Sequence, residues 1–288
     1  MKVLVTGGAG FVGSHLCRRL VEGGHAVVSL DNYFTGSRDN HVPGVSYREG
    51  HTKDVAHHVP EDVDIIFHLG EYSRVEISFS EPHVVWDLNI AGTAGVLEFW
   101  RKKKCKLVYV GSSTKFSEDG DGKSQSPYAW AKAMNTELVK NYAVWYDLPF
   151  AIAYLYNVYG PGERADKYGT VIEIFKQYYL AGKPLPVVSP GTQKRMFTHV
   201  DDVVDGLTLV GTKGSGDGFH LGSEEEYSII DVANLFNHPI QWLPERKGNR
   251  SASSIDTVKS RALGWKPKHR VEDYIRGVVR NAMRKEMS

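Results

Sequence analysis

The strongest constraint in the chain is a glycine-rich turn that follows directly on a short β-branched run. Residues 3–13 read Val-Leu-Val-Thr-Gly-Gly-Ala-Gly-Phe-Val-Gly. Gly7 permits a sharp turn, Gly10 leaves room for a pyrophosphate against the backbone, and Gly13 lets the next helix lie close to the strand. That helix would direct its N-terminal amides at the phosphates. The pattern predicts a dinucleotide-binding turn, and a purely structural glycine turn is the alternative.

An acidic residue stands where a bound dinucleotide requires one. Asp31 ends a second apolar run, residues 25–30, about 20 residues after the turn. A carboxylate there accepts hydrogen bonds from the adenosine ribose hydroxyls and repels a 2′-phosphate, which favours NAD over NADP. The alternative is that Asp31 and Asn32 only cap a turn.

The overall composition excludes several classes of function. The chain has 288 residues with 35 basic and 34 acidic side chains and a net charge of +1, so nothing indicates binding to nucleic acid or to a membrane surface. No apolar run approaches the roughly 18 residues of a membrane span. Cys17 and Cys105 resemble small buried residues rather than a disulfide framework. Because the first strand begins at Lys2, we expect no secretory signal and a cytoplasmic protein.

Strand and helix patterns alternate through the first half of the chain. We expect strands near 2–6, 26–30, 45–48, 64–68, 106–111 and 150–155, and helices near 11–23, 82–103, 127–146 and 170–181. This alternation predicts an α/β fold with a doubly wound parallel sheet of Rossmann type. Proline and glycine become frequent after about residue 157, which indicates a smaller, irregular C-terminal lobe for the substrate. We therefore expect an NAD-binding domain over 1–157, to which 197–222 return, and a substrate lobe formed by 158–196 and 223–288.

A tyrosine and a lysine four residues apart carry the predicted chemistry. Ser126 and Pro127 suit the start of a helix, and Tyr128 and Lys132 then lie on one of its faces. The ammonium favours the phenolate and so lowers the tyrosine pKa from about 10, which allows proton exchange with a substrate hydroxyl. The hydroxyls of residues 112–114 end a strand and can hold the same oxygen. A second tyrosine–lysine pair, at 179 and 183, is interpreted as surface.

Together these motifs resemble the extended short-chain dehydrogenase/reductase family, and in particular its nucleotide-sugar epimerases and dehydratases. The resemblance implies bound NAD, a nucleotide-diphosphate sugar as substrate, and Ser113, Tyr128 and Lys132 as catalytic residues. The implied cofactor-binding residues, besides Tyr128 and Lys132, are Gly7, Gly10, Phe11, Val12, Gly13, Asp31, Asn32, His51, Thr52, Leu69, Gly70 and Asn89. The implied substrate-binding residues are Thr114, Asn157, Arg195, Arg246, Asn249 and Ser253.

Departures from the family pattern narrow the expected reaction. Dehydratases of the family carry an Asp-Glu pair after the catalytic threonine and the decarboxylases a glutamate, whereas here Lys115 follows Thr114. Because 4-epimerisation needs only the hydroxyl, tyrosine and lysine, we expect a 4-epimerase acting through a 4-keto sugar, on a UDP-hexose or UDP-N-acetylhexosamine. The small Ser253 favours an N-acetyl group at C2. Either Ser113 or Thr114 can be the catalytic hydroxyl, and Ser113 is favoured.

Other interpretations stay open at this stage. The same intermediate supports dehydration, 4-keto reduction or epimerisation at C3 or C5, and the fold also occurs in non-catalytic NAD-binding proteins. Glu71 and its neighbours replace a more usual small-residue run beside the cofactor. The histidines show no metal-ligand spacing, so no metal is expected, and His199 is interpreted as structural. By resemblance we expect a homodimer, with Trp86, Trp100 and Trp145 as candidates for its interface.

Overall fold

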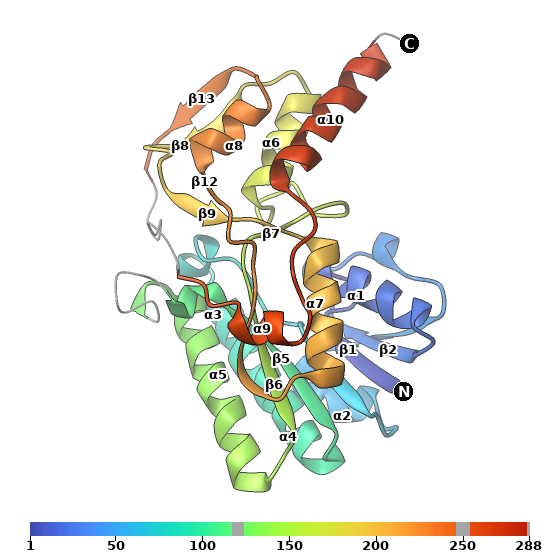
Figure 1. Cartoon of the computed structure of the whole chain (residues 1–288). Coiled ribbons are helices and arrows are strands. Elements are labelled where there is room, and N and C mark those ends of the chain that lie inside the picture. Colours follow the sequence, from blue (N-terminus) through green and yellow to red (C-terminus); the bar gives the residue numbers. More distant parts are fainter. Residues whose placement is uncertain (117–123, 246–253, 287–288) are drawn as a thin grey trace.

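A seven-stranded parallel sheet forms the centre of the molecule. The computed structural model describes residues 1–116, 124–245 and 254–286. The strands lie in the order β11-β6-β5-β4-β1-β2-β3 (Figure 1). Their bounds are β1 Lys2–Thr6, β2 Ala26–Asp31, β3 Val45–Glu49, β4 Ile65–His68, β5 Lys106–Ser112, β6 Phe150–Leu155 and β11 Gly216–Leu221. The predicted α/β fold with a Rossmann-type parallel sheet is confirmed.

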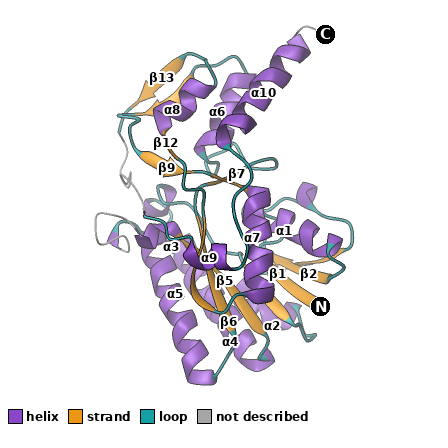
Figure 2. Cartoon of the chain, in the orientation of Figure 1, coloured by secondary structure: helices purple, strands orange, loops and turns teal. Residues whose placement is uncertain are grey.

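Helices cover both faces of this sheet (Figure 2). The longer helices of this part of the chain are α1 Phe11–Glu22, α4 Gly92–Lys103, α5 Pro127–Tyr146 and α7 Val200–Lys213. Shorter helical segments are η1 Arg38–Asn40, η2 Thr52–Asp54, α2 Val55–His58, η3 Ile77–Phe79, α3 Pro82–Val85, the π-helical η4 Trp86–Ala91, η5 Ser113–Phe116 and α9 Val258–Ala262. The predicted helix over 82–103 is therefore one helical region in which a π-helical turn separates two α-helical parts.

Successive residues of the central strands point to opposite faces and so build two separate cores. Val3 and Val5 of β1 pack with Leu16 of α1 and Leu207 of α7 on one face. Leu4 packs on the other face in a cluster that includes residues of α4 and α5. Because both faces are buried, the strands read as continuous apolar runs rather than alternating ones.

The strand order reverses between β1 and β4, and this reversal positions the site. From β1 the chain runs outward through β2 to β3, and it then crosses back to β4 on the other side of β1. The loops after β1 and β4 therefore separate at the carboxyl edge, where open α/β sheets hold their ligands. They nevertheless stay close at their bases, because a Cβ built on Gly7 would lie 2.9 Å from the Cα of Gly70.

A smaller lobe follows the sheet (Figure 1) and has its own hydrophobic core. Its helices are α6 Val171–Leu180, α8 Ile229–Leu235 and α10 Val271–Glu286, and its strands are β8 Leu185–Val188, β9 Lys194–Met196, β12 Glu226–Ser228 and β13 Ile240–Leu243. Two more short strands, β7 Val158–Tyr159 and β10 Thr198–His199, pair in parallel. Phe175 and Phe236 are buried in the core of the lobe. Pairs β8–β13 and β9–β12 form two further small sheets.

One of the three tryptophans assigned to an intersubunit surface is in the core. Trp100 is fully buried, and its indole Nε1 donates to the carbonyl of Cys105 at 2.8 Å. The prediction for Trp100 is therefore wrong, because the helical period alone does not show which face of a helix meets the sheet. Trp86 and Trp145 are 40% and 60% exposed. Among the described residues, no helix has the length and apolar character that a transmembrane segment requires.

The glycine turn yields a stability prediction. A Cβ on Gly13 would lie 2.0 Å from the carbonyl oxygen of Gly7, so Gly13→Ala must displace backbone. We expect the free energy of unfolding, measured by urea titration, to fall by about 1–3 kcal/mol. Gly277→Ala is the matched control, because a Cβ at this helical position meets nothing within 4 Å and should add about 0.5–1 kcal/mol. Equal stability of Gly13→Ala and the wild type would contradict the close contact.

Candidate active site

One cavity of about 400 Å³ joins the glycine turn to the tyrosine–lysine pair. It lies at the carboxyl edge of the sheet, where the loops after β1, β4 and β5 meet the first turns of α5. The predicted site residues that line it are Gly7, Gly10, Phe11, Val12, Gly13, Asp31, Asn32, Thr52, Leu69, Gly70, Ser113, Thr114, Tyr128, Lys132 and Asn157. Residues more than a hundred positions apart in the sequence thus share one cavity.

The glycine turn presents a helix N-terminus to this cavity. The Gly7 N–H donates to the carbonyl of Leu30 at 2.8 Å, and Gly7 has a φ of +75°, which a glycine adopts without strain. Gly10 is the N-cap of α1, and no side chain caps that end of the helix. The first amides of α1 therefore offer a positive, uncapped helix end to an anion. This geometry fits the pyrophosphate of a dinucleotide.

Asp31 both closes the turn and lines the cavity. Its Oδ2 accepts from the Ala9 N–H at 2.9 Å, and its Oδ1 accepts from the Tyr33 N–H at 2.8 Å. The residue is 6% exposed. Burial raises the pKa of its carboxyl, and the two backbone amides oppose that rise. Asp31 therefore caps the turn, as the alternative interpretation expected. A contact between its carboxylate and an adenosine ribose stays a prediction.

Helix α5 positions Tyr128 and Lys132. The Ser126 side chain accepts from the Ala129 N–H at 3.0 Å and Pro127 occupies the first turn, so the predicted N-cap is confirmed. Tyr128 is 8% exposed and Lys132 5%. Four residues apart on a helix, they lie on one face, and both line the cavity. Ser113 and Thr114 line it as well, so the structure does not separate these two candidates for the catalytic hydroxyl.

Lys132 has an acidic partner that the sequence analysis did not identify. Its Nζ donates to the carbonyl of Val110 at 2.5 Å and to Oε2 of Glu71. The Glu71 side chain is 4% exposed, which makes this a buried ion pair. Burial lowers the pKa of Lys132, and Glu71 opposes that change. Burial alone would raise the pKa of Glu71, but Lys132, His68 and the hydrogen bonds bring it below its usual value.

The second oxygen of Glu71 is held by three neutral donors. Its Oε1 accepts from Thr93 Oγ1 at 2.9 Å, from Tyr109 Oη at 3.1 Å and from Asn135 Nδ2 at 2.8 Å. The signal that could have revealed this role is a carboxylate directly after an apolar strand and a glycine.

The buried polar network continues from Thr93 back to the first strand. Thr93 Oγ1 lies 3.0 Å from His68 Nε2, and His68 Nδ1 lies 2.7 Å from Thr6 Oγ1. Burial lowers the pKa of His68 to about 4, so the ring is neutral at pH 7. Hydrogen bonds therefore connect β1, next to the glycine turn, with α5.

Three further charged residues of the cavity, Arg74, Glu163 and Arg164, were missed because they lie in irregular segments. Arg74 Nε donates to the carbonyl of Tyr168. Burial lowers the pKa of Arg74, and the nearby Glu163 and Tyr128 partly oppose that change. Glu163 is 8% exposed, and its Oε1 accepts from the Thr170 N–H at 3.1 Å. Its Oε2 has no hydrogen-bond partner within the described part of the chain. Burial raises the pKa of Glu163 to about 7.

Several predicted site residues do not line the cavity. His51 Nε2 lies 3.1 Å from Asp87 Oδ2, and His51 Nδ1 accepts from the Lys53 N–H at 3.0 Å. Asn89 makes two hydrogen bonds to the backbone of Tyr72, at 2.6 and 3.0 Å, and so fixes the loop after β4. Arg195 lies on β9. Arg246, Asn249 and Ser253 lie outside the described residues.

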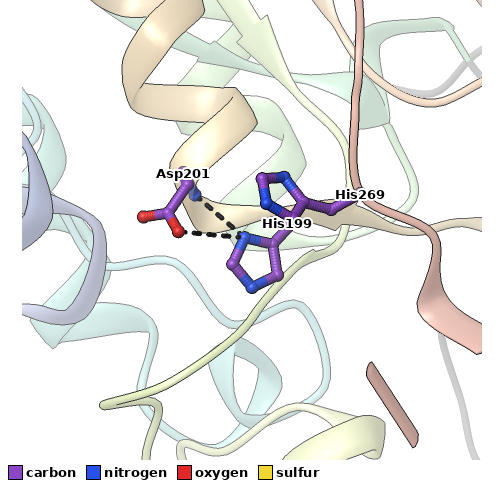
Figure 3. A group of neighbouring side chains, drawn as sticks. All are labelled: His199, Asp201 and His269. Carbon is purple, nitrogen blue, oxygen red and sulfur yellow. Dashed lines mark hydrogen bonds and ion pairs between the residues drawn. The ribbon is translucent and has the colours of Figure 1, made fainter. Parts of the chain in front are cut away.

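A separate group of possible ligand atoms is formed by His199, Asp201 and His269 (Figure 3). His199 Nδ1 accepts from the Asp201 N–H at 3.2 Å and caps α7, while His269 Nδ1 lies 2.9 Å from Asp202 Oδ1. The two rings stack with centroids 4.5 Å apart and an interplanar angle of 28°. Because ring lone pairs lie in the ring planes, stacked imidazoles do not converge on an ion between them. This geometry supports a structural role for His199.

Comparison with known proteins fits this geometry. The fold is that of a Rossmann-type α/β protein, with the cavity at the carboxyl edge of its parallel sheet. Residues 3–222 match the NAD dependent epimerase/dehydratase family, and the chain belongs to that family.

Individual relatives carry out different reactions. The chain is 31% identical to UDP-glucose 4-epimerase of Mycolicibacterium smegmatis, with 93% of this chain and 94% of that protein covered. It is 32% identical to UDP-N-acetyl-alpha-D-glucosaminuronate decarboxylase of Bacillus cytotoxicus, with 81% and 78% covered. The crystal structure of Thermotoga maritima UDP-glucose 4-epimerase with UDP-glucose matches with a TM-score of 0.89, 27% identity and 100% coverage of both chains. Family membership alone therefore does not fix the reaction.

The buried ion pair predicts a pH-dependent loss of stability in Lys132→Met. Without the ammonium, the carboxylate of Glu71 stays buried and unpaired, and its removal from water should cost about 3–5 kcal/mol at pH 7. Burial then raises the pKa of Glu71, so the deficit should shrink as the pH falls and the carboxyl takes up a proton. Urea unfolding at pH 7 and pH 5 measures both effects.

The exposed pair of Lys140 and Glu137 provides the control for Lys132→Met, since Lys140→Met should change stability little at either pH. A deficit for Lys132→Met that is the same at both pH values would show that Glu71 does not carry the effect.

Proposed function

We propose that this protein is an NAD-dependent nucleotide-sugar 4-epimerase that acts through a transient 4-keto sugar, on a UDP-hexose or a UDP-N-acetylhexosamine. The observation that carries the proposal is the shared cavity, in which Ser113, Tyr128 and Lys132 face the same space as the glycine turn. The similarity to UDP-glucose 4-epimerases supports the choice of reaction.

The proposed chemistry divides between the cofactor and three side chains. NAD, when bound, supplies a reversible acceptor for the hydride of C4. Tyr128, as the phenolate, accepts the proton of the C4 hydroxyl and later returns it. Ser113 donates a hydrogen bond to the C4 oxygen and holds it in line with the phenolate. Lys132 stabilises the phenolate electrostatically and would hold the nicotinamide ribose.

The remaining predicted residues would hold the two ligands. The turn from Gly7 to Gly13 and the N-terminus of α1 suit the cofactor pyrophosphate, and Asp31 suits its adenosine ribose. We propose residues 1–157 with 197–222 as the NAD-binding domain and residues 158–196 with 223–288 as the substrate lobe. In this arrangement Asn157, Arg195 and Arg246 contact the diphosphate of the sugar nucleotide, for which amide and guanidinium donors are suited.

One observation favours a second candidate, a decarboxylation or elimination from the same 4-keto sugar. Glu163 lines the cavity, has an unpartnered oxygen, and burial raises its pKa to about 7, so it can exchange a proton near neutral pH. A relative of this chain is a decarboxylase. Glu163 would then supply the acid that relatives carry directly after the catalytic hydroxyl, where this chain has Lys115.

Product analysis separates the two candidates. Purified protein is incubated separately with UDP-GlcNAc, UDP-glucose, GDP-mannose and dTDP-glucose, and products are followed by NMR. For a 4-epimerase we expect interconversion of C4 epimers of at least one substrate with no net consumption of NAD. Loss of water from one of these compounds would instead support elimination, and release of carbon dioxide in a parallel incubation with UDP-glucuronic acid would support decarboxylation. If none of the four compounds is epimerised at C4, the proposed reaction is wrong.

Tyr128→Phe tests the assigned base. Loss of the phenolic oxygen should lower kcat by about 10²–10⁴-fold, while NAD is still bound. Tyr142→Phe is the matched control, because this tyrosine lies on the same helix and hydrogen-bonds Glu98 at 2.8 Å. A non-catalytic NAD-binding protein would tolerate both changes equally.

We also propose that the protein is a homodimer through the outer surface of α5 and the adjoining η4. Trp86, Trp130 and Trp145 are 40%, 44% and 60% exposed, and the rings of Trp86 and Trp130 are in edge-on contact at 5.6 Å. Exposed aromatic side chains of this size are typical of interfaces. Trp130→Glu should shift the mass measured by light scattering from dimer to monomer, whereas Val258→Glu, an exposed apolar position on α9, should not. A wild-type monomer at micromolar concentration would exclude the proposal.

A further inference from the structure

The Lys132 ammonium is held by two acceptors of the protein, both on residues that line the same cavity. Two of its three N–H groups have acceptors in the protein, namely the carbonyl of Val110 and Oε2 of Glu71. The ammonium also lies 4.4 Å from the ring centroid of Tyr109. Both charged side chains of the pair are less than a tenth exposed, at 7% for Lys132 and 4% for Glu71. Solvent therefore screens neither charge effectively.

We propose that Glu71 is a positioning residue for the active site: its carboxylate fixes the Lys132 ammonium and sets the net charge that Tyr128 experiences. The inference rests on the proposed function in one respect, since it takes Tyr128 to be the proton acceptor. It concerns a residue for which the sequence analysis found no role.

The orientation of the carboxylate supports a directed role. Thr93, Tyr109 and Asn135 donate to Oε1, which leaves Oε2 for the ammonium. These donors come from α4, β5 and α5, so three elements hold the group in place. A buried ion pair contributes little net stability relative to apolar side chains of the same size. Stability alone is therefore a weak explanation for a carboxylate at this point in the core.

The charges around Tyr128 determine the direction of the effect. Lys132 and Arg74 are the cations beside it, Glu71 is the anion that compensates Lys132, and Glu163 is an acid near Arg74. Tyr109 interacts with both Glu71 and Tyr128, and burial raises its pKa well above the usual value, so it stays neutral. His68 is neutral at pH 7 because burial lowers its pKa to about 4. Removal of the Glu71 charge thus leaves the Lys132 charge uncompensated.

Glu71→Gln removes the charge and keeps the size of the side chain. Loss of a nearby negative charge lowers the pKa of every neighbouring proton donor, so both Tyr128 and Lys132 should deprotonate at lower pH. At separations of several ångströms in a poorly screened site, the expected shift is about one pH unit or more. The whole pH profile of kcat/KM should then move toward acid, with both limbs displaced in the same direction.

The phenolate of Tyr128 is measured directly by ultraviolet absorbance during a pH titration of the NAD-bound protein. Subtracting the titration of the same protein with Tyr128→Phe isolates this one tyrosine. We expect the midpoint in Glu71→Gln to lie about one pH unit or more below that of the wild type. Glu137→Gln is the matched control, because Glu137 is an exposed acid on α5, the helix of Tyr128, and pairs with Lys140. The Tyr128 midpoint in this variant should equal that of the wild type.

A lower activity with an unmoved midpoint would overturn the inference, since a purely structural role changes the height of the profile and not its position. If Glu71→Gln does not fold, the pair Lys132→Met and Glu71→Gln/Lys132→Met replaces it, because the double variant buries no unpaired charge. The Tyr128 midpoint should be lower in the double variant than in Lys132→Met, and equal midpoints would overturn the inference. The titration needs no sugar, so a shifted midpoint in a protein that epimerises none of the tested sugars would reject the proposed function and keep the inference.

Discussion

The close contact between the glycine turn and the start of α1 is the constraint on which the rest of the site depends. The position that a Cβ would take on Gly13 lies 2.0 Å from the carbonyl of Gly7, so only glycine lets the helix begin there. The contact places the uncapped N-terminus of α1 at the carboxyl edge of the sheet, in the wall of the cavity. Gly7 in turn touches the backbone of Gly70 after β4, and this contact brings Glu71 to the same edge. The cofactor turn and the acidic residue are therefore placed by one set of backbone contacts.

A polar chain runs through the otherwise apolar interior beneath this edge. It passes from Thr6 to His68, to Thr93 and to Glu71, and it ends at Lys132. The cores on the two faces of the sheet consist of packed apolar side chains. Buried polar groups are costly unless they are paired, and each member of this chain has partners. Such a network favours one arrangement of β1, β4 and α5, which is what a site assembled from these three elements requires.

The sequence predicted six of the seven strands of the sheet and the start of α5, because these depend on local patterns, whereas β11, whose first half is Gly-Asp-Gly, was not predicted. Residues 3–5 form a short apolar run that ends at the glycine turn, and Ser126 with Pro127 is a local helix start. The pairing of Glu71 with Lys132 joins residues 61 positions apart and depends on how β4 and α5 lie in space, which no local pattern specifies. The strands of the smaller lobe are two to four residues long, too short to show a period. Trp100 was misassigned because a helical pattern with apolar residues on several faces does not identify the buried one.

The positions of the acids bear on the class of reaction. Lys115 stands where a decarboxylase or dehydratase of this family would carry an acid, and its ammonium lies 3.3 Å from Tyr154 Oη and near Asp217, outside the residues that line the cavity. Besides Asp31 at the end of β2, the acids that line the cavity are Glu71 in the loop after β4 and Glu163 in the loop after β7. Glu71 is already committed to Lys132, so it serves the lysine rather than a sugar. Glu163 is then the carboxyl with an unpartnered oxygen in the described part of the cavity. Elimination in this site therefore requires a substrate that places a leaving group next to Glu163. A substrate that offers only its C4 hydroxyl to the site can be epimerised but not dehydrated.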